Sequence, residues 1–352
     1  MFVGINNKET IFVPVAACNE YFLEHTVKGA LALAEHPDRV FFGIYNNILS
    51  KDQTLLDNDF FTNNPNIYYV EVISPEPLGV GFARMSASLL TTMDHDYVFQ
   101  TDAHSILSKN WDTTFINNFK EISQKENTDK IVLTAMCGDG WHYNKEDRNS
   151  LSSLNHDFKN FSVDSFYDNN FALEYGIDNA LPSLHFDGYQ NGIYLQEMVG
   201  VPISHSSDRD INGQYEEINC IIATIMFSKY SLMREVMHDP EDPFHGDQIN
   251  YAIRLLSRNY KIFAVKQPLV MALGKSVVKD GELVEVDNKY NWRATVSANK
   301  GYYDYKNQKS VANYLNIVNE KYFGYWGAPD KESLIKAKKK MGYLNKHYFY
   351  FK

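Results

Sequence analysis

The first 140 residues alternate short apolar runs with segments of helical periodicity, and this order constrains the fold more than any other feature. The apolar runs are rich in β-branched and aromatic residues, as buried strands are. They read TIFVPVAA (10–17), RVFFGIYNN (39–47), NIYYVEVI (66–73), YVFQTDAH (97–104) and KIVLTAM (130–136). Strands and helices in this order favour an open parallel sheet of about five strands with right-handed crossovers.

The segments between these runs carry apolar residues three or four positions apart, which predicts amphipathic helices. The first helix is expected within residues 20–36, because the pattern stops before Pro37. Two more are expected at FARMSASLLTTM (82–93) and WDTTFINNFKEISQ (111–124), where Trp111 is expected to pack and Asp112 to cap the helix. Ligands of open α/β sheets bind outside the carboxyl ends of the strands, so we expect the site there.

The second half of the chain is organised differently. Residues 142–215 are rich in Asn, Asp and Ser but interrupted by aromatic residues, which indicates long loops or a lid over the sheet rather than a linker. A strand followed by a helix is predicted in 217–236, and a turn, an amphipathic helix and a strand in 242–265. We therefore expect one domain over 1–280, with 142–215 as an insertion, followed by a C-terminal helical extension over 281–352.

The end of that extension, KAKKKMGYLNKHYFYFK (336–352), mixes lysines with aromatic residues. Such a segment can follow a nucleic-acid backbone and stack on bases. It can equally be a helix whose lysines face water while its rings pack on the domain. The sequence leaves both interpretations open.

Composition narrows the class of protein. The 352 residues carry a formal net charge of -10. A chain this acidic is not expected to attract nucleic acid or anionic lipid over its whole surface. Cys18, Cys137 and Cys220 are too scattered for a disulfide framework or a thiolate zinc site and are expected to be reduced thiols. The sequence contains neither a secretory signal nor a stretch of about 20 apolar residues, so we predict no membrane association and a cytoplasmic location, in the host if the chain is viral.

The fourth apolar run ends on Asp102 and His104. Side chains two apart on a strand point to the same face, so a strand that continued to His104 would present both together. A carboxylate and an imidazole can share one divalent ion, such as Mn²⁺ or Mg²⁺, and leave coordination positions for phosphate oxygens. A solvent-facing loop is the alternative interpretation of this short motif.

The surrounding residues resemble one enzyme family, the Skp1-type UDP-GlcNAc:hydroxyproline polypeptide transferases and their bacterial and viral relatives, which are GT-A glycosyltransferases. The resemblance follows a pattern of Gly-x-x-x-Ala-Arg, a helix, Tyr-x-x-Gln-x-Asp-x-His and a later Trp-Asp. Its positions here are Gly79, Ala83, Arg84, Tyr97, Gln100, Asp102, Ala103, His104, Trp111 and Asp112. Weaker similarity extends it to most of residues 10–265 and implies a GT-A fold, with an open, mostly parallel sheet and flanking helices.

The resemblance also implies a site. Asp102 and His104 are predicted metal ligands, and the residues predicted to contact the nucleotide sugar are Ala16, Cys18, Asn19, Glu20, Arg84, Asp102 and Ala103. Asp247 is predicted to orient or deprotonate the acceptor hydroxyl, although it equally suits a helix cap. Arg84 could instead form a surface ion pair, and residues 16–20 could be an ordinary polar strand end. His238 is expected to be a satisfied turn residue.

Three parts of the sequence depart from the family pattern. Asp247 and Gln248 stand where the family has two glutamates, and the first loop carries Cys18, Asn19 and Glu20 in place of aromatic and Arg-Asp residues. Ala272 stands where the family has a later histidine that completes the metal site. The third ligand is then expected to come from His185, His205 or His245, or from water.

The function implied is metal-dependent transfer of a sugar from a UDP-sugar to a hydroxyl group, with retention of configuration. The transferred sugar is a hexose, a HexNAc or a pentose, and the acceptor is expected to be a protein or glycan hydroxyl. A hydroxylated base in phage DNA is an alternative, which the basic tail and a composition typical of AT-rich genomes favour. A second alternative is a binding module for nucleotide sugars that performs no catalysis.

Overall fold

The computed structural model describes the two halves of the chain to different extents. The described residues are 9–18, 20, 23–48, 58–74, 78–91, 93–135, 138–139, 215–218, 221, 225–240, 247–265, 269–272, 276–279, 282–285 and 332. The predicted insertion over 142–215 therefore lies outside the described residues except at Tyr215. The predicted extension over 281–352 does so except at 282–285 and Glu332.

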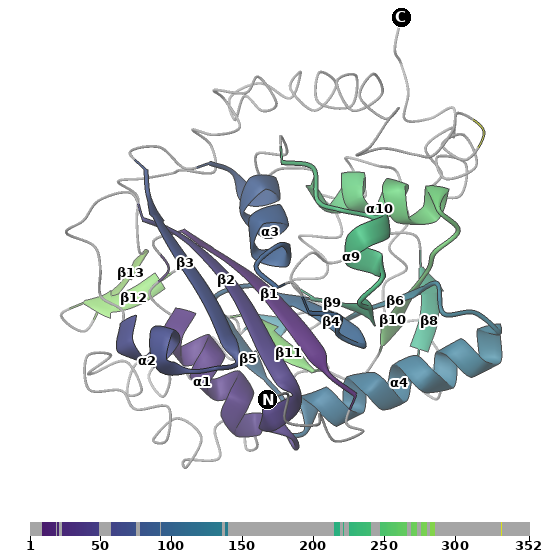
Figure 1. Ribbon diagram of the computed structural model, residues 1–352, viewed down its shortest axis with the longest axis horizontal. Helices are drawn as coiled ribbons and strands as arrows, with labels where there is room; N and C mark the ends of the chain where they lie inside the picture. The colour runs from purple at the N-terminus through teal and green to yellow at the C-terminus, as the bar shows by residue number, and fades with distance from the viewer. Residues whose placement is uncertain are drawn as a thin grey trace, which may run out of the picture.

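An open eight-stranded sheet forms the centre of the molecule (Figure 1). Its strands are β1 (Ile11–Cys18), β2 (Val40–Ile48), β3 (Ile67–Ile73), β4 (Tyr97–Thr101), β6 (Ile131–Ala135), β8 (Tyr215–Ile218), β9 (Ile225–Lys229) and β10 (Lys261–Val265). They lie in the order β3-β2-β1-β4-β9-β6-β10-β8, and only β9 and β8 run antiparallel to their neighbours. The predicted fold class, an open and mostly parallel α/β sheet with flanking helices, is confirmed.

Helices cover both faces of this sheet. They are α1 (Leu23–Leu33), α2 (Asn58–Asn63), α3 (Val80–Ser88), α4 (Trp111–Glu126), α9 (Leu232–Glu235) and α10 (Asp247–Ser257), with a short 3₁₀ helix, η1 (Pro37–Arg39). Figure 1 shows α1, α2 and α4 along one side of the sheet and α3, α9 and α10 along the other. α3 is shorter than predicted, because the Leu89 and Leu90 amides bond to carbonyls three residues back and tighten its last turn.

The larger part of the core lies between the sheet and the pair α1 and α4. Trp111 is fully buried there, as expected, and its indole nitrogen donates to the Ala30 carbonyl oxygen over 2.8 Å. Phe99, Phe115 and Phe227 pack in the same cluster, with the rings of Phe115 and Phe227 stacked 5.1 Å apart. This packing fixes the positions of α1 and α4 relative to β4.

The strand that carries the Asp-x-His motif ends earlier than predicted. β4 stops at Thr101, and residues 102–104 form a turn that leads into β5 (Ser105–Leu107). β5 belongs to a separate three-stranded sheet with β11 (Val270–Ala272) and β7 (Gly138–Asp139). The prediction that Asp102 and His104 share a strand face was therefore wrong, because the chain leaves the main sheet before Asp102.

Two further observations concern the remaining elements. β12 (Ser276–Lys279) and β13 (Glu282–Glu285) pair antiparallel as a two-stranded sheet. Within the described residues, no helix is both long enough and apolar enough to cross a bilayer.

Candidate functional site

The candidate site lies where the strand order of the main sheet reverses. From β1 the chain proceeds outward to β2 and β3, and it then returns to place β4 on the other side of β1. β1 and β4 are parallel, so the segments that follow Cys18 and Thr101 leave the sheet at the same edge. Such reversal points form the crevice in which open α/β sheets bind ligands.

Asp102 follows β4 directly and is held by a buried arginine. Nη2 of Arg84 donates to Oδ1 of Asp102 over 3.2 Å, and the Arg84 side chain is only 8% exposed. Arg84 comes from α3, which packs on β1 and β2. Because Arg84 is buried and Asp102 is half-buried, the alternative of a surface ion pair for Arg84 does not hold. The contact leaves Oδ2 of Asp102 turned toward His104.

His104 lies between two carboxylates. Its Nε2 is 3.7 Å from Oδ2 of Asp102, and its Nδ1 is 2.9 Å from Oε2 of Glu20. Glu20 belongs to the loop between β1 and α1 and is 84 residues away in the chain. All three side chains are at least three-quarters buried, with exposures of 10% for Glu20, 16% for His104 and 22% for Asp102. The structure therefore joins Asp102 and His104, as predicted, and adds Glu20 to them.

The turn that carries His104 is fixed from α1 by Thr26. The Thr26 hydroxyl donates to the Ala103 carbonyl oxygen over 3.0 Å and accepts the Ser105 amide over 2.9 Å. Thr26 is 1% exposed, so both hydrogen bonds are shielded from water. One side chain thus satisfies the backbone on each side of His104 and holds the turn against the helix.

A buried polar cluster lies on the α10 side of β4. The Gln100 Oε1 atom and the His238 Nε2 atom are 2.6 Å apart, and the His238 ring stacks on Tyr251 with centroids separated by 4.3 Å. Burial lowers the pKa of His238 well below its usual value, and the nearby Arg84 and Arg254 lower it further. His238 is therefore neutral and donates to the amide oxygen of Gln100. The expectation of a satisfied residue is confirmed at this position.

A second polar group lies at the carboxyl ends of β2 and β3. Asn46 is 1% exposed, and its Nδ2 donates to the Tyr69 hydroxyl over 3.0 Å. That hydroxyl donates in turn to Glu71 over 2.8 Å. Among the described residues, no donor reaches the buried Asn46 Oδ1 atom. Asn46 is level with Ala17 of β1, so this acceptor lies beside residues 16–20, which include the residues predicted to contact the nucleotide sugar.

The other predicted site residues have varied positions. Ala16 and Cys18 are half-buried at the end of β1, and Ala103 is 2% exposed, with its methyl group in the core. Asn19 lies outside the described residues. Asp247 begins α10, as the sequence predicted for the helix, but its side chain is outside the described part of the structure.

The paired side chains fit a divalent cation. Two ligand atoms on one ion lie at most about twice a metal–oxygen bond apart, about 4–5 Å for bonds of about 2.0–2.6 Å. The 3.7 Å between Asp102 Oδ2 and His104 Nε2 is within that limit. One carboxylate oxygen and one imidazole nitrogen are ligands that Mn²⁺ accepts.

The described residues do not supply a third protein ligand. No cluster of three or more His, Cys, Asp or Glu side chains that could hold a metal occurs among the described residues. His185, His205 and His245 lie outside those residues. Ala272 pairs with Ser105 across β11 and β5, so its backbone lies beside the residue that follows His104.

Sequence reasoning missed the roles of Thr26 and Gln100 and the link from Glu20 to His104. A threonine inside a helical pattern gives no signal of its own, because its partner is a turn 77 residues away. Gln100 was part of the family pattern, two residues before Asp102, but its partner His238 is 138 residues away. Glu20 was predicted as a site residue only through the family resemblance, as a contact of the nucleotide sugar.

Known proteins are similar to this chain over most of its length. Residues 61–273, more than half of the 352, match the family model described as Glycosyltransferase (GlcNAc). Among solved structures, GalNAc-T7 with UDP, GalNAc and Mn²⁺ is similar, with a TM-score of 0.47 and 11% sequence identity. That similarity covers 96% of this chain and 55% of GalNAc-T7, so this chain spans little more than half of that protein. No curated protein matches.

Proposed function

Because the chain belongs to the Glycosyltransferase (GlcNAc) family, we propose that it transfers a sugar from a UDP-sugar to a hydroxyl group of a macromolecule. The observation that carries the proposal is the cluster of Arg84, Asp102 and His104 at the point where the strand order reverses. A reversal point is where open α/β sheets bind nucleotides. The resemblance to Skp1-type transferases makes UDP-GlcNAc the first donor to test.

Asp102 and His104 would hold Mn²⁺ or Mg²⁺ in this proposal. When bound there, the cation supplies positive charge next to the diphosphate that leaves the sugar. Arg84 positions Asp102, since its contact with Oδ1 leaves Oδ2 toward His104. The guanidinium also adds a fixed positive charge at the edge where a diphosphate would bind.

The base of the donor would lie over the ends of β1 and β2. Ala16, Cys18, Asn19 and Glu20 are the residues that the resemblance assigns to it. The buried Asn46 Oδ1 atom supports this placement, because a uracil N3–H group is a donor of the kind that it lacks among the described residues. Asn46 is thereby added to the proposed nucleotide contacts.

The bond changes follow from retention of configuration, which the resemblance implies. The bond between the sugar carbon and the diphosphate oxygen breaks, and the acceptor oxygen forms a bond to the same carbon. The acceptor proton passes to the departing phosphate oxygen, so no separate enzymic base is required. Asp247, at the start of α10, would orient the acceptor hydroxyl.

The experiment is a screen of UDP-sugars with Mn²⁺ for thermal stabilisation and for slow release of UDP. We expect stabilisation by one UDP-sugar and a fall of at least about 100-fold in UDP release in Asp102→Asn, because a site that stabilises developing charge contributes that much. Asp94→Asn is the matched control, since Asp94 pairs with Arg234 on the surface and is 76% exposed.

Four outcomes would change the proposed function or contradict the proposed site. Stabilisation without UDP release would favour the binding module over the enzyme. Full activity in Asp102→Asn, or no stabilisation by any nucleotide, would contradict the proposed site. Hydroxyl-bearing peptides, glycans and duplex DNA with hydroxymethylated bases serve as parallel acceptors, and transfer to DNA alone would select the alternative acceptor.

A further inference from the structure

We propose that Glu20 is a positioning residue that holds His104 in a single tautomer and orientation, with Nε2 directed to the Asp102 side. The proposal rests on the proposed function, because it assigns Nε2 as the atom that binds the cation. It gives Glu20 a role different from the nucleotide contact predicted from the sequence. In this role Glu20 acts on the cation site through His104.

The geometry places the two carboxylates at opposite nitrogens of one ring. Glu20 Oε2 is 2.9 Å from Nδ1, which is hydrogen-bonding distance, whereas Asp102 Oδ2 is 3.7 Å from Nε2, which is too long for a hydrogen bond. Glu20 and His104 are therefore hydrogen-bonded, whereas the gap between Asp102 Oδ2 and His104 Nε2 leaves room for an ion. The ring therefore separates Glu20 from the position of the cation.

The chemistry of the contact selects the tautomer. An ionised carboxylate only accepts hydrogen bonds, so the hydrogen between Glu20 and His104 must be on Nδ1. In a neutral imidazole the other nitrogen then carries a lone pair. Nε2 is thus ready to bind a metal, and the carboxylate also raises its basicity. Without Glu20 the ring can adopt the other tautomer, in which Nε2 carries a hydrogen and cannot bind the ion.

The segment after β1 contacts both the side chain of His104 and the backbone on either side of it. Glu20 holds the side chain from the β1–α1 loop, while Thr26 of α1 holds the backbone through the Ala103 carbonyl and the Ser105 amide. The exposure of Glu20, only 10%, limits competition from water for the Nδ1 hydrogen. Two independent contacts from one segment leave the imidazole little freedom to turn.

The first test needs no metal. The ¹⁵N chemical shifts of the His104 ring, recorded in metal-free protein where the imidazole is neutral, report which nitrogen carries the hydrogen. We expect the hydrogen on Nδ1 in the wild type, a mixture of tautomers in Glu20→Ala, and recovery of the Nδ1 form in Glu20→Gln, whose side-chain oxygen still accepts.

The second test measures Mn²⁺ affinity by calorimetry. We expect a loss of about 10- to 100-fold in Glu20→Ala, as for other residues that orient metal ligands, and a smaller loss in Glu20→Gln. Glu24→Ala is the control, because Glu24 is an acid on α1 that pairs with Lys28. A variant that keeps the wild-type thermal transition separates a lost contact from a lost fold.

The outcomes are distinct for the inference and for the proposed function. A wild-type hydrogen on Nε2, or the same tautomer in Glu20→Ala, overturns the positioning role. An equal loss of affinity in Glu24→Ala also overturns it, because the effect would then be one of net charge. A wild type with the Nδ1 tautomer that binds neither Mn²⁺ nor Mg²⁺ overturns the metal assignment of the proposed function and leaves the tautomer contact standing.

Discussion

At the scale of single residues, Asp112 illustrates how a buried charge is held. It is fully buried in α4, and its carboxylate accepts the backbone amides of Glu35 and His36 and pairs with Arg39 over 2.8 Å. The expectation that it caps its own helix was wrong, because α4 begins at Trp111 and the partners of Asp112 lie in the segment after α1. That segment needs the acceptor, since its amides have no helical partner.

We predict that Asp112→Ala lowers the free energy of unfolding by about 3–5 kcal/mol, because it leaves the buried Arg39 guanidinium without its carboxylate. Urea unfolding followed by circular dichroism measures the loss. Lys28→Ala removes a half-buried helical pair and a contact with the Phe60 ring, and it is expected to cost about 1 kcal/mol or less. Similar losses in the two variants would show that the buried Asp112–Arg39 pair contributes no more to the free energy of unfolding than the Lys28–Glu24 pair.

At the scale of elements, the approach of α3 to β2 sets the position of Arg84. A Cβ atom on Gly43 of β2 would lie 2.5 Å from the Ala87 backbone carbonyl oxygen and would also overlap the Phe12 ring. Glycine is therefore needed for the helix to lie directly on the strand. Ala87 and Arg84 are less than one helical turn apart, so this contact brings Arg84 down to Asp102.

We predict that Gly43→Ala moves α3 outward and weakens two properties together. Thermal stability should fall, as overpacking of a core typically costs about 1–3 kcal/mol, and the affinity for a stabilising UDP-sugar should fall as well. Thermal unfolding with and without the nucleotide measures both. Leu89→Ala, at the exposed end of the same helix, is the control. Unchanged affinity in Gly43→Ala would mean that the position of α3 does not matter for the site.

At the scale of the whole molecule, two buried histidines make stability depend on pH. His95 packs between Phe12 and Phe41, and burial lowers its pKa to about 4, although Asp96 and Asp94 oppose the shift. Burial also lowers the pKa of His238 well below its usual value. The unfolded chain takes up protons on these residues below about pH 6.5, whereas the folded chain keeps them neutral.

The contribution of these histidines to stability is therefore complete above about pH 6.5 and decreases as the pH falls toward 4. Urea midpoints measured across this range should shift to lower denaturant concentration with falling pH. His95→Phe keeps a ring against Phe12 and removes one titrating group, so its midpoint should fall less steeply. An identical slope in the variant would contradict the assignment to His95.

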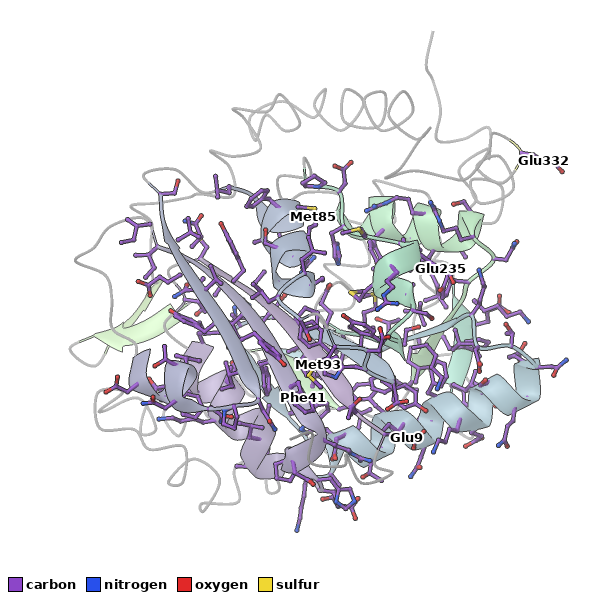
Figure 2. All side chains as sticks on the ribbon, viewed as in Figure 1. Glu9, Phe41, Met85, Met93, Glu235 and Glu332 are labelled. Carbon is purple, nitrogen blue, oxygen red and sulfur yellow. The ribbon has the colours of Figure 1, made fainter. Side chains whose placement is uncertain are left out.

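A solvent-exposed ion pair lies near the amino end of β4. Glu9, labelled in Figure 2 beside α4, accepts hydrogen bonds from the Tyr97 hydroxyl over 2.9 Å and from Lys120 over 2.5 Å. Lys120 is 48% exposed, so the pair is screened by water and adds little stability. Asp112 is fully buried whereas the Glu9 side chain is 34% exposed, so we expect the Glu9 pair to contribute less to stability.

The sequence alone determined the alternation of strands and helices and the presence of an acid and a histidine at the end of the fourth strand. Both signals are local, because hydrophobic periodicity depends on neighbours within a few residues. The tertiary structure decided the rest. It inserted β9 antiparallel between β4 and β6, and it brought Glu20 to His104 across 84 residues. Contacts of that range depend on the order of strands in the sheet, which no short stretch of sequence encodes.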